Sequence, residues 1–387
     1  SLYRSRSGER GIFNRQGAIR KVTASGRRDP RYDFGTNPCV TGDTPILTSQ
    51  GYQAIRDCVG HEVSIWNGNE WSTVTPFSTG ENRLVTVTFS DGTSLTCTPY
   101  HKFILQNHGR GQHFKKEAQY LNAGDKLAKF SMPIISGKEE YEGDAYSQGF
   151  YQGDGNANLN RSWVYIPKMI CASRLKGRVG EVTRWGRDDW VHGDMLPKSF
   201  VPMHGTLKYK ADWVAGLLDA DGTVVRDNGV ALQLTSVDVD FLNHVRLMLT
   251  TMGVQAKVSP DGRGVHECMG YEARPTYRLL INQTDTQTLV GKCGVVFSRL
   301  DVPVQDVQRD ARRFVTVVSV EGLDRTEETF CFTEPKNNSG TFAGILTGNC
   351  GEIILRSREF CNLTETVVRP DDTESSLAEK IRLASIL

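Results

Sequence analysis

The chain reads Cys39-Val40-Thr41-Gly42-Asp43 near its start and Thr347-Gly348-Asn349-Cys350 near its end. If everything from Cys39 to Asn349 is removed, Pro38 joins Cys350 and the outer pieces form one continuous segment. A thiol at each junction can attack a carbonyl carbon, and an asparagine before the second junction can cyclise and cut the chain there. The sequence therefore predicts a segment that excises itself from a host protein.

Length and charge bound the possible functions. At 387 residues and a net charge of +1, the chain can form two or three domains, and any nucleic-acid surface must come from local basic patches. No apolar run approaches the ~20 residues of a membrane span, and the first residues lack the apolar core of a signal peptide. Nine cysteines without a CxxC pair argue against a zinc site. We expect a cytoplasmic protein with free thiols and no membrane partner.

Two β-rich regions flank a mixed centre. Residues 84–89 alternate apolar and polar, and 93–97 return after a Ser-Asp-Gly turn, which is a strong hairpin signal. Residues 313–333 show the same style, with a turn expected at Glu321-Gly322. The centre alternates helix-like and strand-like stretches, which indicates a domain inserted into another domain. We predict five segments with the boundaries 1–38, 39–130, 131–310, 311–349 and 350–387.

Three residues provide the reactive groups at the two junctions. Cys39 is the expected first nucleophile, Cys350 the second, and Asn349 the residue that cyclises. Cysteine suits this role because its thiolate is easily reached near neutral pH.

Residues 39–46 and 96–103 carry two further motifs, and both resemble the conserved blocks of inteins. The resemblance implies a mainly β, horseshoe-shaped Hint-type fold, which inteins share with Hedgehog-type autoprocessing domains. Within Thr98-x-x-His101 it implies that His101 bonds and protonates the amide nitrogen of Cys39, while Thr98 orients that amide. A lone histidine at a strand end would otherwise be read as a structural one.

The closing motif departs from the intein pattern. Gly348 stands where the family usually has a histidine, so the acid that assists asparagine cyclisation is not identified. Cys331 matches a position where the family carries Asp or Cys, which implies a role in thiol exchange. The alternative is a small buried hydrophobic residue on a strand, and both readings stay open.

Two central stretches carry the same pattern of small residues before an acid. Residues 213–222 read Trp-Val-Ala-Gly-Leu-Leu-Asp-Ala-Asp-Gly, and 145–155 repeat the spacing around Gly149 and Gly153. Small residues four apart on one helix face let two helices touch. The longer stretch resembles the LAGLIDADG motif of homing endonucleases, which implies an inserted α+β domain with two αββ-type halves. A simple glycine cap at a helix end is the weaker alternative.

The LAGLIDADG resemblance also implies a chemistry. Asp154 and Asp221 would hold Mg²⁺ at the helix ends for hydrolysis of both DNA strands. Lys198 matches a lysine that helps to activate water, and an ordinary surface lysine is the alternative. Double-stranded DNA at the host gene's insertion site is the expected partner of a monomeric protein. Basic residues expected to contact DNA are Arg174, Lys176, Arg178, Arg184 and Arg187.

The joined flanks resemble the catalytic subunit of ribonucleotide reductase, most closely the cobalamin-dependent type. The resemblance makes Cys350 the thiyl-radical residue, and it gives Asn37 and Glu352 the task of holding and deprotonating the ribose. Cys361 would be one of the reducing thiols, and the host cofactor would be cobalamin.

The sequence leaves three alternatives open. The endonuclease domain can be inactive while splicing proceeds. A Hedgehog-like domain that cleaves without ligation is disfavoured by Asn349-Cys350 and by readable host sequence on both sides. A DNA-binding module without enzymatic activity would make the whole Cys39, Asn349 and Cys350 set a coincidence.

Overall fold

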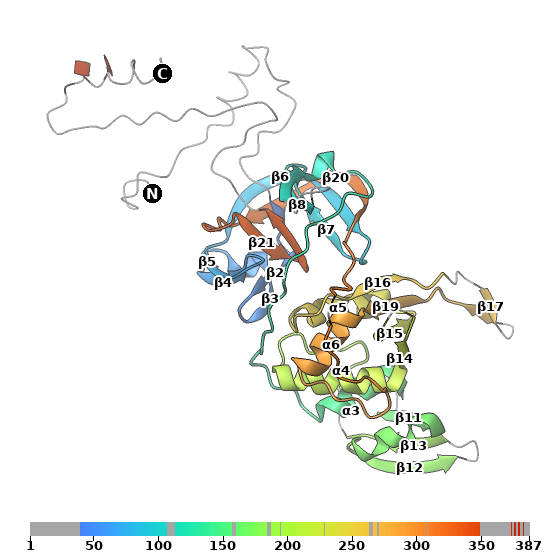
Figure 1. Ribbon diagram of the computed structural model, residues 1–387. Coiled ribbons are helices and arrows are strands. Elements are labelled where there is room, and N and C mark those ends of the chain that lie inside the picture. Colours follow the sequence, from blue (N-terminus) through green and yellow to red (C-terminus); the bar gives the residue numbers. More distant parts are fainter. Residues whose placement is uncertain are drawn as a thin grey trace. The chain divides into compact units, whose positions relative to one another are not determined.

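The computed structural model describes residues 39–348 except for the short gaps 107–112, 157–159, 184–186, 194, 228, 263–265, 269–270 and 308, together with six residues between 373 and 382 (Figure 1). The chain separates into two compact units, one of residues 37–350 and the other of 1–36 with 351–387. All site geometry below belongs to the first unit. No helix in the described part of the chain is long and apolar enough to cross a membrane.

The first β-rich layer is a small closed barrel. Its strands, in spatial order, are β1 (Val40–Thr41), β20 (Val317–Cys331), β6 (Phe77–Phe89) and β7 (Ser94–Cys97). The predicted hairpin is confirmed, because Val85 pairs with Cys97 and Thr88 with Ser94. The turn predicted at Glu321-Gly322 is wrong. Gly322 instead pairs with Val85 inside β20, because the long β6–β20 ribbon absorbs its irregularities as bulges rather than as a turn.

A second sheet completes the part of the chain made of residues 39–130 and 311–348, which is called the splicing part after its predicted role. Its strands, in spatial order, are β5 (Trp71–Val74), β4 (Val63–Trp66), β2 (Pro45–Thr48), β21 (Ser339–Phe342), β22 (Ile345–Gly348), β8 (Lys102–Gln106) and β9 (His113–Glu117), with β3 (Gly51–Ala54) on β2. Two 3₁₀ helices, η1 (Ile55–Cys58) and η2 (Ala118–Tyr120), lie in this part. Strands from both ends of the inserted segment thus alternate in the two layers, and the expected mainly β Hint-type arrangement is confirmed (Figure 1).

The inserted domain consists of two related halves. The first contains α3 (Ala145–Asp154), β10 (Gly155–Asn156), β11 (Arg161–Tyr165), η3 (Ile166–Ser173), β12 (Arg178–Thr183) and β13 (Arg187–Val191). The second contains α4 (Leu207–Asp221), β14 (Gly222–Val225), β15 (Ala231–Ser236), α5 (Val239–Thr250), β16 (Lys257–Pro260), β17 (His266–Cys268), β18 (Tyr271–Ala273), β19 (Tyr277–Ile281) and α6 (Gln283–Gly291).

Both halves repeat one topology. Their sheets have the orders β10-β11-β13-β12 and β14-β15-β19-β16. If the four strands of each sheet are numbered along the chain, both sheets have the spatial order 1-2-4-3. The second half adds the helices α5 and α6 to the predicted αββ unit. This shared order supports an origin of the two halves as repeats of one motif.

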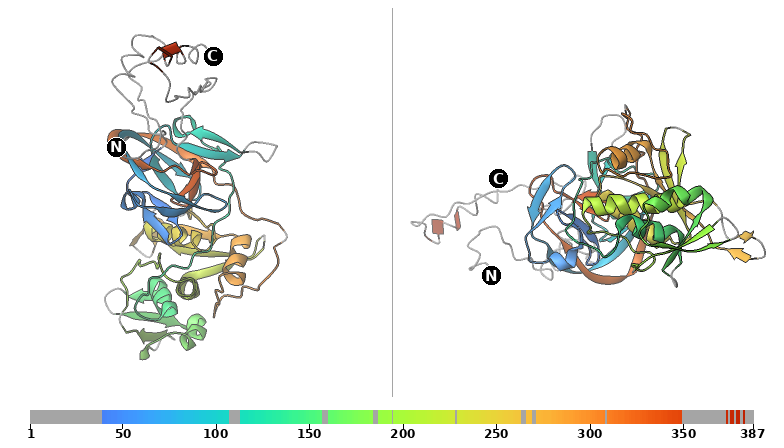
Figure 2. Two further views of the ribbon diagram at one scale, coloured as in Figure 1. Left: turned by 90° about the vertical axis from the view of Figure 1, so that its left-hand side faces the viewer. Right: turned by 90° about the horizontal axis from the view of Figure 1, so that it is seen from below.

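Helices α3 and α4 touch backbone to backbone at the centre of the domain (Figure 2). A Cβ atom added to Gly149 would lie 1.9 Å from the carbonyl oxygen of Trp213, and one added to Gly216 would lie 2.0 Å from that of Tyr146. Only glycine allows this approach, as the small-residue spacing predicts. The contact places Asp154 and Asp221, the last residues of the two helices, beside each other.

The inserted domain is packed on the splicing part through α5. The hydroxyl groups of Tyr52 and Thr250 are 2.9 Å apart, and Leu247 packs on a small apolar cluster that contains Leu47. The backbone N–H of Val258 donates to the carbonyl oxygen of Asp91 at 2.8 Å. These contacts join the two parts by polar and apolar interactions within the same unit.

Candidate functional sites

The first junction lies where three strands of the barrel meet. Val40 pairs with Cys97 on one side and with Phe330 on the other, so Cys39 enters the barrel fully buried. The N–H of Cys39 donates to Thr98 Oγ1 at 3.1 Å, and the N–H of Thr98 donates to the carbonyl oxygen of Cys39 at 2.8 Å. Thr98 therefore fixes the amide whose bond to Pro38 would break.

Cys331 lies against Cys39 in the same buried cluster, with Phe77 packed on both. The hydrogen bond with Cys331 and burial raise the pKa of the Cys39 thiol well above its ordinary value, and hydroxyl groups of Thr79 and Thr329 oppose this only in part. The expectation of a thiolate that is easily reached near neutral pH is therefore wrong for the folded chain. Low polarity around the thiol disfavours the charged form, so its proton must leave as the sulfur attacks.

His101 is buried next to the junction but is not bonded to Cys39. Its Nε2 lies 2.9 Å from Thr347 Oγ1, and its Nδ1 is buried without a hydrogen-bond partner. The expected bond from His101 to the Cys39 amide is thus not formed, because the ring is held between Phe103 and Phe342 with one nitrogen facing β22. Burial lowers the pKa of His101 to about 3, so the ring is neutral.

The second junction follows β22. Gly348, the last residue of this strand, pairs with Ser339, while Asn349 and Cys350 lie outside the described residues. A Cβ atom on Gly348 would approach Lys102 Cβ and Lys115 Cδ to 3.2 Å. The Lys115 ammonium donates to the carbonyl oxygen of Asn338 at 2.6 Å, and desolvation together with the charge of Lys102 lowers the pKa of Lys115.

The two predicted carboxylates share one cation in the second site. Lys168 Nζ, from η3, lies 2.7 Å from Asp154 Oδ2 and 3.6 Å from Asp221 Oδ1. Burial raises the pKa of Asp154 to about 6 despite the hydrogen bond from Lys168, and the charge of Asp221 adds to the rise. Two carboxylates at one place provide oxygen ligands of the kind that Mg²⁺ binds in proteins.

The two acids of the longer motif have different tasks. Asp219 is fully buried and accepts hydrogen bonds from the Tyr146 hydroxyl at 2.7 Å and from the N–H groups of Ser298 and Arg299 at 2.7 and 3.0 Å. The Asp221 side chain is 40% exposed. Asp219 therefore holds the chain after α6 to the helix, and only Asp221 faces the shared site.

Lys198 lies at the end of α3 rather than on the surface. Its Nζ donates to the carbonyl oxygens of Tyr151 at 2.8 Å and Gln152 at 2.6 Å, and burial lowers its pKa. It therefore binds carbonyl groups of the last turn of α3, the turn that ends at Asp154.

Some predicted residues lie elsewhere, and others were missed. Arg174 bonds Asp212 and stacks on Tyr146, so it serves the domain's own packing rather than a free basic surface. Lys168 and Lys115 were not predicted, because neither belongs to a recognisable motif. Among the described residues, no group of three or more His, Cys, Asp or Glu side chains could hold a metal ion. The host residues Asn37, Glu352 and Cys361 lie outside the described residues.

Comparison with known proteins finds matches for the inserted domain and for the chain as a whole. A family model described as a LAGLIDADG-like domain matches residues 208–294, which cover α4 to α6. The ribonucleoside-diphosphate reductase large subunit of Invertebrate iridescent virus 6 is 36% identical over 352 residues, covering 83% of this chain and 36% of the relative. The inserted domain is thus similar to LAGLIDADG-like domains, and the chain is similar to a ribonucleoside-diphosphate reductase large subunit over most of its own length.

The similarity to reductases includes most of residues 39–349. The flanks 1–38 and 350–387 make up less than a fifth of the chain, so an alignment over 83% of it must include most of the inserted segment. The NrdEB subunit alpha of Bacillus subtilis, also a ribonucleoside-diphosphate reductase, is 23% identical over 84% of this chain and 37% of its own length. The chain thus spans just over a third of the length of these relatives.

Other similar proteins are less closely related. The replication factor C small subunit of Methanocaldococcus jannaschii is 24% identical over 43% of this chain and 10% of its own length. A DnaB intein from Synechocystis sp. PCC 6803 aligns at 10% identity over 80% of this chain and 97% of that one, with a TM-score of 0.30. Variants of the homing endonuclease I-DmoI align at 16% identity over 40% and 95%, with a TM-score of 0.26. At these TM-scores the structural likeness supports no further conclusion.

Proposed function

We propose that this intein excises residues 39–349 and joins Pro38 to Cys350. The observation that carries the proposal is the Cys39 amide held by Thr98 beside a second buried thiol, with β22 leading to Asn349 in the same layered structure. This arrangement supports the proposal, because it fixes the amide of the first junction beside the thiols of Cys39 and Cys331.

The reaction proceeds through four bond changes. Cys39 Sγ attacks the Pro38 carbonyl carbon, which gives a thioester and frees the Cys39 amine. Cys350 Sγ then takes over the acyl group. The side-chain nitrogen of Asn349 attacks its own carbonyl carbon, which closes a succinimide and releases the amine of Cys350. That amine displaces its own sulfur from the acyl group, and a peptide bond results.

The surrounding residues would supply orientation and proton transfer. Thr98 holds the scissile amide, and the neutral His101 ring can accept a proton at its unpartnered Nδ1 and later deliver it. The hydrogen bond between His101 and Thr347 links this ring to β22 two residues before Asn349. Cys331, next to Cys39, can carry the acyl group for a time by thiol exchange.

Lys115 is our candidate for the acid that replaces the missing histidine. It lies against Gly348 and has a lowered pKa, so its ammonium group gives up a proton more readily than an ordinary lysine. In this role it would protonate the amine that leaves when Asn349 cyclises. Its hydrogen bond to Asn338 is the merely structural alternative.

Mass spectrometry of the purified chain over time tests splicing. We expect a product that lacks residues 39–349, a branched or N-cleaved species in Asn349→Ala, and cleavage after Asn349 without ligation in Cys39→Ala. Splicing at the normal rate in Cys39→Ala would show that the first nucleophile is another residue.

We also infer that the inserted domain cuts double-stranded DNA of the intein-free host gene. Asp154 and Asp221 would hold Mg²⁺, which supplies a Lewis acid and an activated water. Lys168 forms ion pairs with both carboxylates, and Lys198 fixes the end of the helix that carries Asp154. The relatives support the idea that the inserted segment moves between genes, because similar sequence occurs in a reductase and in a protein named as a replication factor.

Cleavage of target DNA separates an active from an inactive endonuclease. The target contains the codons for Pro38 and Cys350 joined directly. We expect cutting with Mg²⁺ that is lost in Asp221→Asn, while splicing continues. If the wild-type chain does not cut this target in low salt with Mg²⁺ or Mn²⁺, the domain retains the fold without the activity. A monomeric state and a cobalamin-dependent host, in which Asn37, Cys350, Glu352 and Cys361 act, remain part of this proposal.

A further inference from the structure

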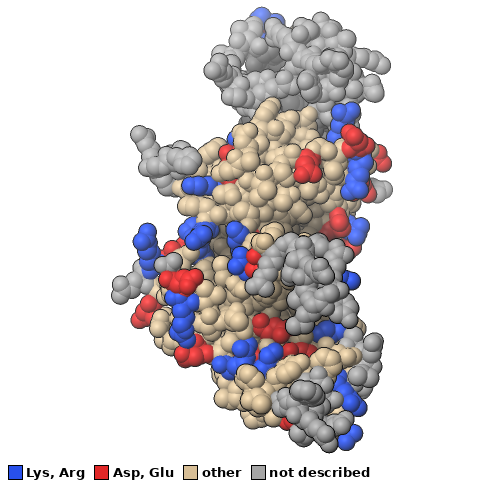
Figure 3. All heavy atoms as spheres, turned by 90° about the vertical axis from the view of Figure 1, so that its right-hand side faces the viewer, with Lys and Arg blue, Asp and Glu red and all other residues tan. Residues whose placement is uncertain are grey.

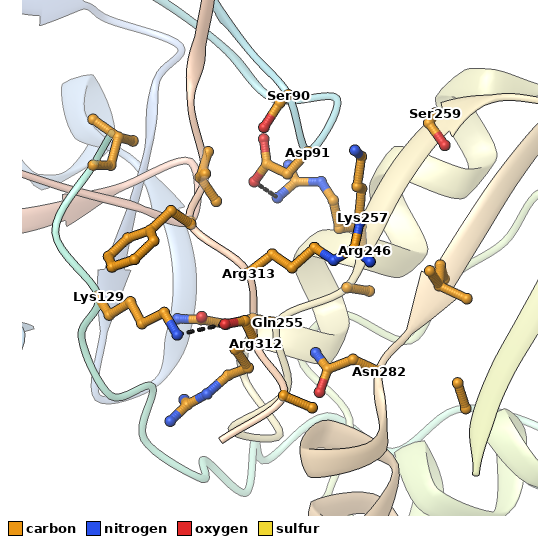
Figure 4. A pocket seen from close by; sticks show the side chains of 18 of the residues that line it. Ser90, Asp91, Lys129, Arg246, Gln255, Lys257, Ser259, Asn282, Arg312 and Arg313 are labelled. Atoms are coloured by element: carbon orange, nitrogen blue, oxygen red, sulfur yellow. Dashed lines mark hydrogen bonds and ion pairs between the residues drawn. The ribbon is translucent and has the colours of Figure 1, made fainter. Parts of the chain in front are cut away.

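A basic cleft of about 650 Å³ lies between the splicing part and the second half of the inserted domain (Figure 4). Its walls come from the outer face of β16 and β19, from Arg246 of α5, and from the linker 311–316 that leads into β20. The described residues that line it include two acids, Asp91 and Asp227. The six cations that line it are Lys129, Arg246, Lys257, Arg278, Arg312 and Arg313. With a net charge of only +1 for the chain, this is a local excess.

The linker wall is fixed to the splicing part. The N–H of Thr316 donates to Ser90 Oγ at 3.0 Å, and the N–H of Leu127 donates to the carbonyl oxygen of Val315 at 2.8 Å. Figure 4 shows Arg313 extending from this linker toward the side of the cleft that carries Arg246 and Lys257. Arg313 therefore adds a charge from the splicing part to a surface of the inserted domain.

The opposite wall is the polar face of a sheet. Leu232, Leu279 and Val258 are buried against the helices, so their strand neighbours Gln233, Arg278 and Lys257 face the cleft. The first strand of this sheet, β14, begins directly after Asp221. The face thus starts at the carboxylate site.

Several cations of the cleft are not matched by acids. Arg278 pairs with Asp261 at 2.9 Å and Arg312 with Asp310 at 3.0 Å, but no described residue forms an ion pair with Lys257 or Arg313. Arg246 is only 5% exposed, and its distance to Asp91 is 3.7 Å. Its Nε is buried without a hydrogen-bond partner, which is unfavourable unless a ligand supplies an acceptor.

We propose that this cleft binds the phosphate backbone of DNA beside the cleaved site, so that the splicing part contributes one wall of the DNA interface; this rests on the proposed endonuclease function. A backbone carries one phosphate after another, which suits cations spread over two walls, and exposed unpaired cations bind it through counterion release. Lysine and arginine side chains gather beside the hollow at this boundary (Figure 3).

Fluorescence anisotropy with the full chain tests the cleft. The chain carries Cys39→Ala and Asn349→Ala to prevent splicing, and Ca²⁺ replaces Mg²⁺ to prevent cutting. Lys257→Gln and Arg313→Gln should each weaken binding of target and unrelated duplexes alike. Each should also reduce the slope of log K against log salt by about 0.9, the value for one phosphate contact. Arg325→Gln, an exposed arginine on β20 outside the cleft, should leave both unchanged.

The possible outcomes separate three situations. If the parent chain binds no DNA, the endonuclease function fails. If the parent binds but Lys257→Gln and Arg313→Gln match Arg325→Gln in affinity and slope, only the cleft proposal is overturned. Inorganic phosphate serves as a further probe. If phosphate raises the melting temperature of the parent but not of Arg313→Gln, and both bind DNA equally, the cleft binds small anions and is not part of a DNA interface.

Discussion

Around Cys39 the side chains are neutral and almost fully buried, whereas around Asp154 and Asp221 they are charged and partly exposed. Cys39, Thr98, His101 and Cys331 are each at most 2% exposed, while Lys168 is 20% and Asp221 40% exposed in their side chains. In the proposed function, the first environment would keep water away from an acyl transfer within the chain. The second would hold a metal ion for an attack on DNA. The comparison teaches that one unit can contain both a neutral, buried site and a charged, partly exposed site.

The strongest test of this separation removes one reactive group at a time. Cys39→Ala should abolish ligation completely, because no other thiol can free the Cys39 amine, and should leave DNA cleavage unchanged. Asp221→Asn should do the reverse. Product mass and a cleavage assay measured on the same preparations report both effects. Loss of both activities in either variant would show that the two sites depend on each other.

Helix contact should matter only to the charged site. Gly216→Ala would place a Cβ atom 2.0 Å from the Tyr146 carbonyl oxygen, so the helices must separate. Overpacking of this kind costs about 1–3 kcal/mol, and we expect loss of cleavage and a lower melting temperature, with splicing retained. Gly291→Ala is the matched control, since its Cβ would meet nothing within 4 Å. Equal melting temperatures for the two variants would contradict the described contact.

Acid should affect the two sites with opposite sign. The pKa of buried His101 is lowered to about 3 from an ordinary 6.5, so it makes the fold less stable as pH falls from 6.5 toward 3. The pKa of Asp154 is raised to about 6, so its contribution makes the fold more stable as pH falls from 6 toward 3.8. Thermal unfolding measured at pH 5 and 7 should show that the wild type loses more stability between pH 7 and pH 5 than His101→Gln does. No difference between the two would mean that His101 is not held neutral.

Substitutions near the second junction should change the rate of splicing less than substitution of Cys39 does. Lys115→Met should slow cyclisation of Asn349, and general acid assistance is typically worth about 10²–10⁴-fold. Gly348→His should change the same rate, partly offset by crowding against Lys102 and Lys115 at 3.2 Å. Cleavage rate against pH is the measurement, because a purely structural role of Lys115 would shift the rate at all pH values alike.

Features that depend on local sequence patterns could be predicted, whereas features that depend on long-range contacts could not. The hairpin of β6 and β7 and the contact of α3 with α4 follow from alternation and from glycine spacing, which a sequence displays directly. The partner of His101 is Thr347, 246 residues away, and the raised pKa of Cys39 depends on burial in a barrel. Lys168 reaches both carboxylates from η3, and no motif marks it. The turn expected at Gly322 was wrong because a polar pair in a long two-stranded ribbon looks like a turn.

The central claim is that one chain splices itself and leaves its host sequence intact. Tandem mass spectrometry of the incubated wild-type chain tests it most directly, by searching for the peptide in which Asn37-Pro38 is followed by Cys350-Gly351. The account predicts that this peptide appears with time, together with free 39–349, and that it is absent from Cys39→Ala. A chain that stays whole, or that only breaks at the two junctions without forming this peptide, would contradict it.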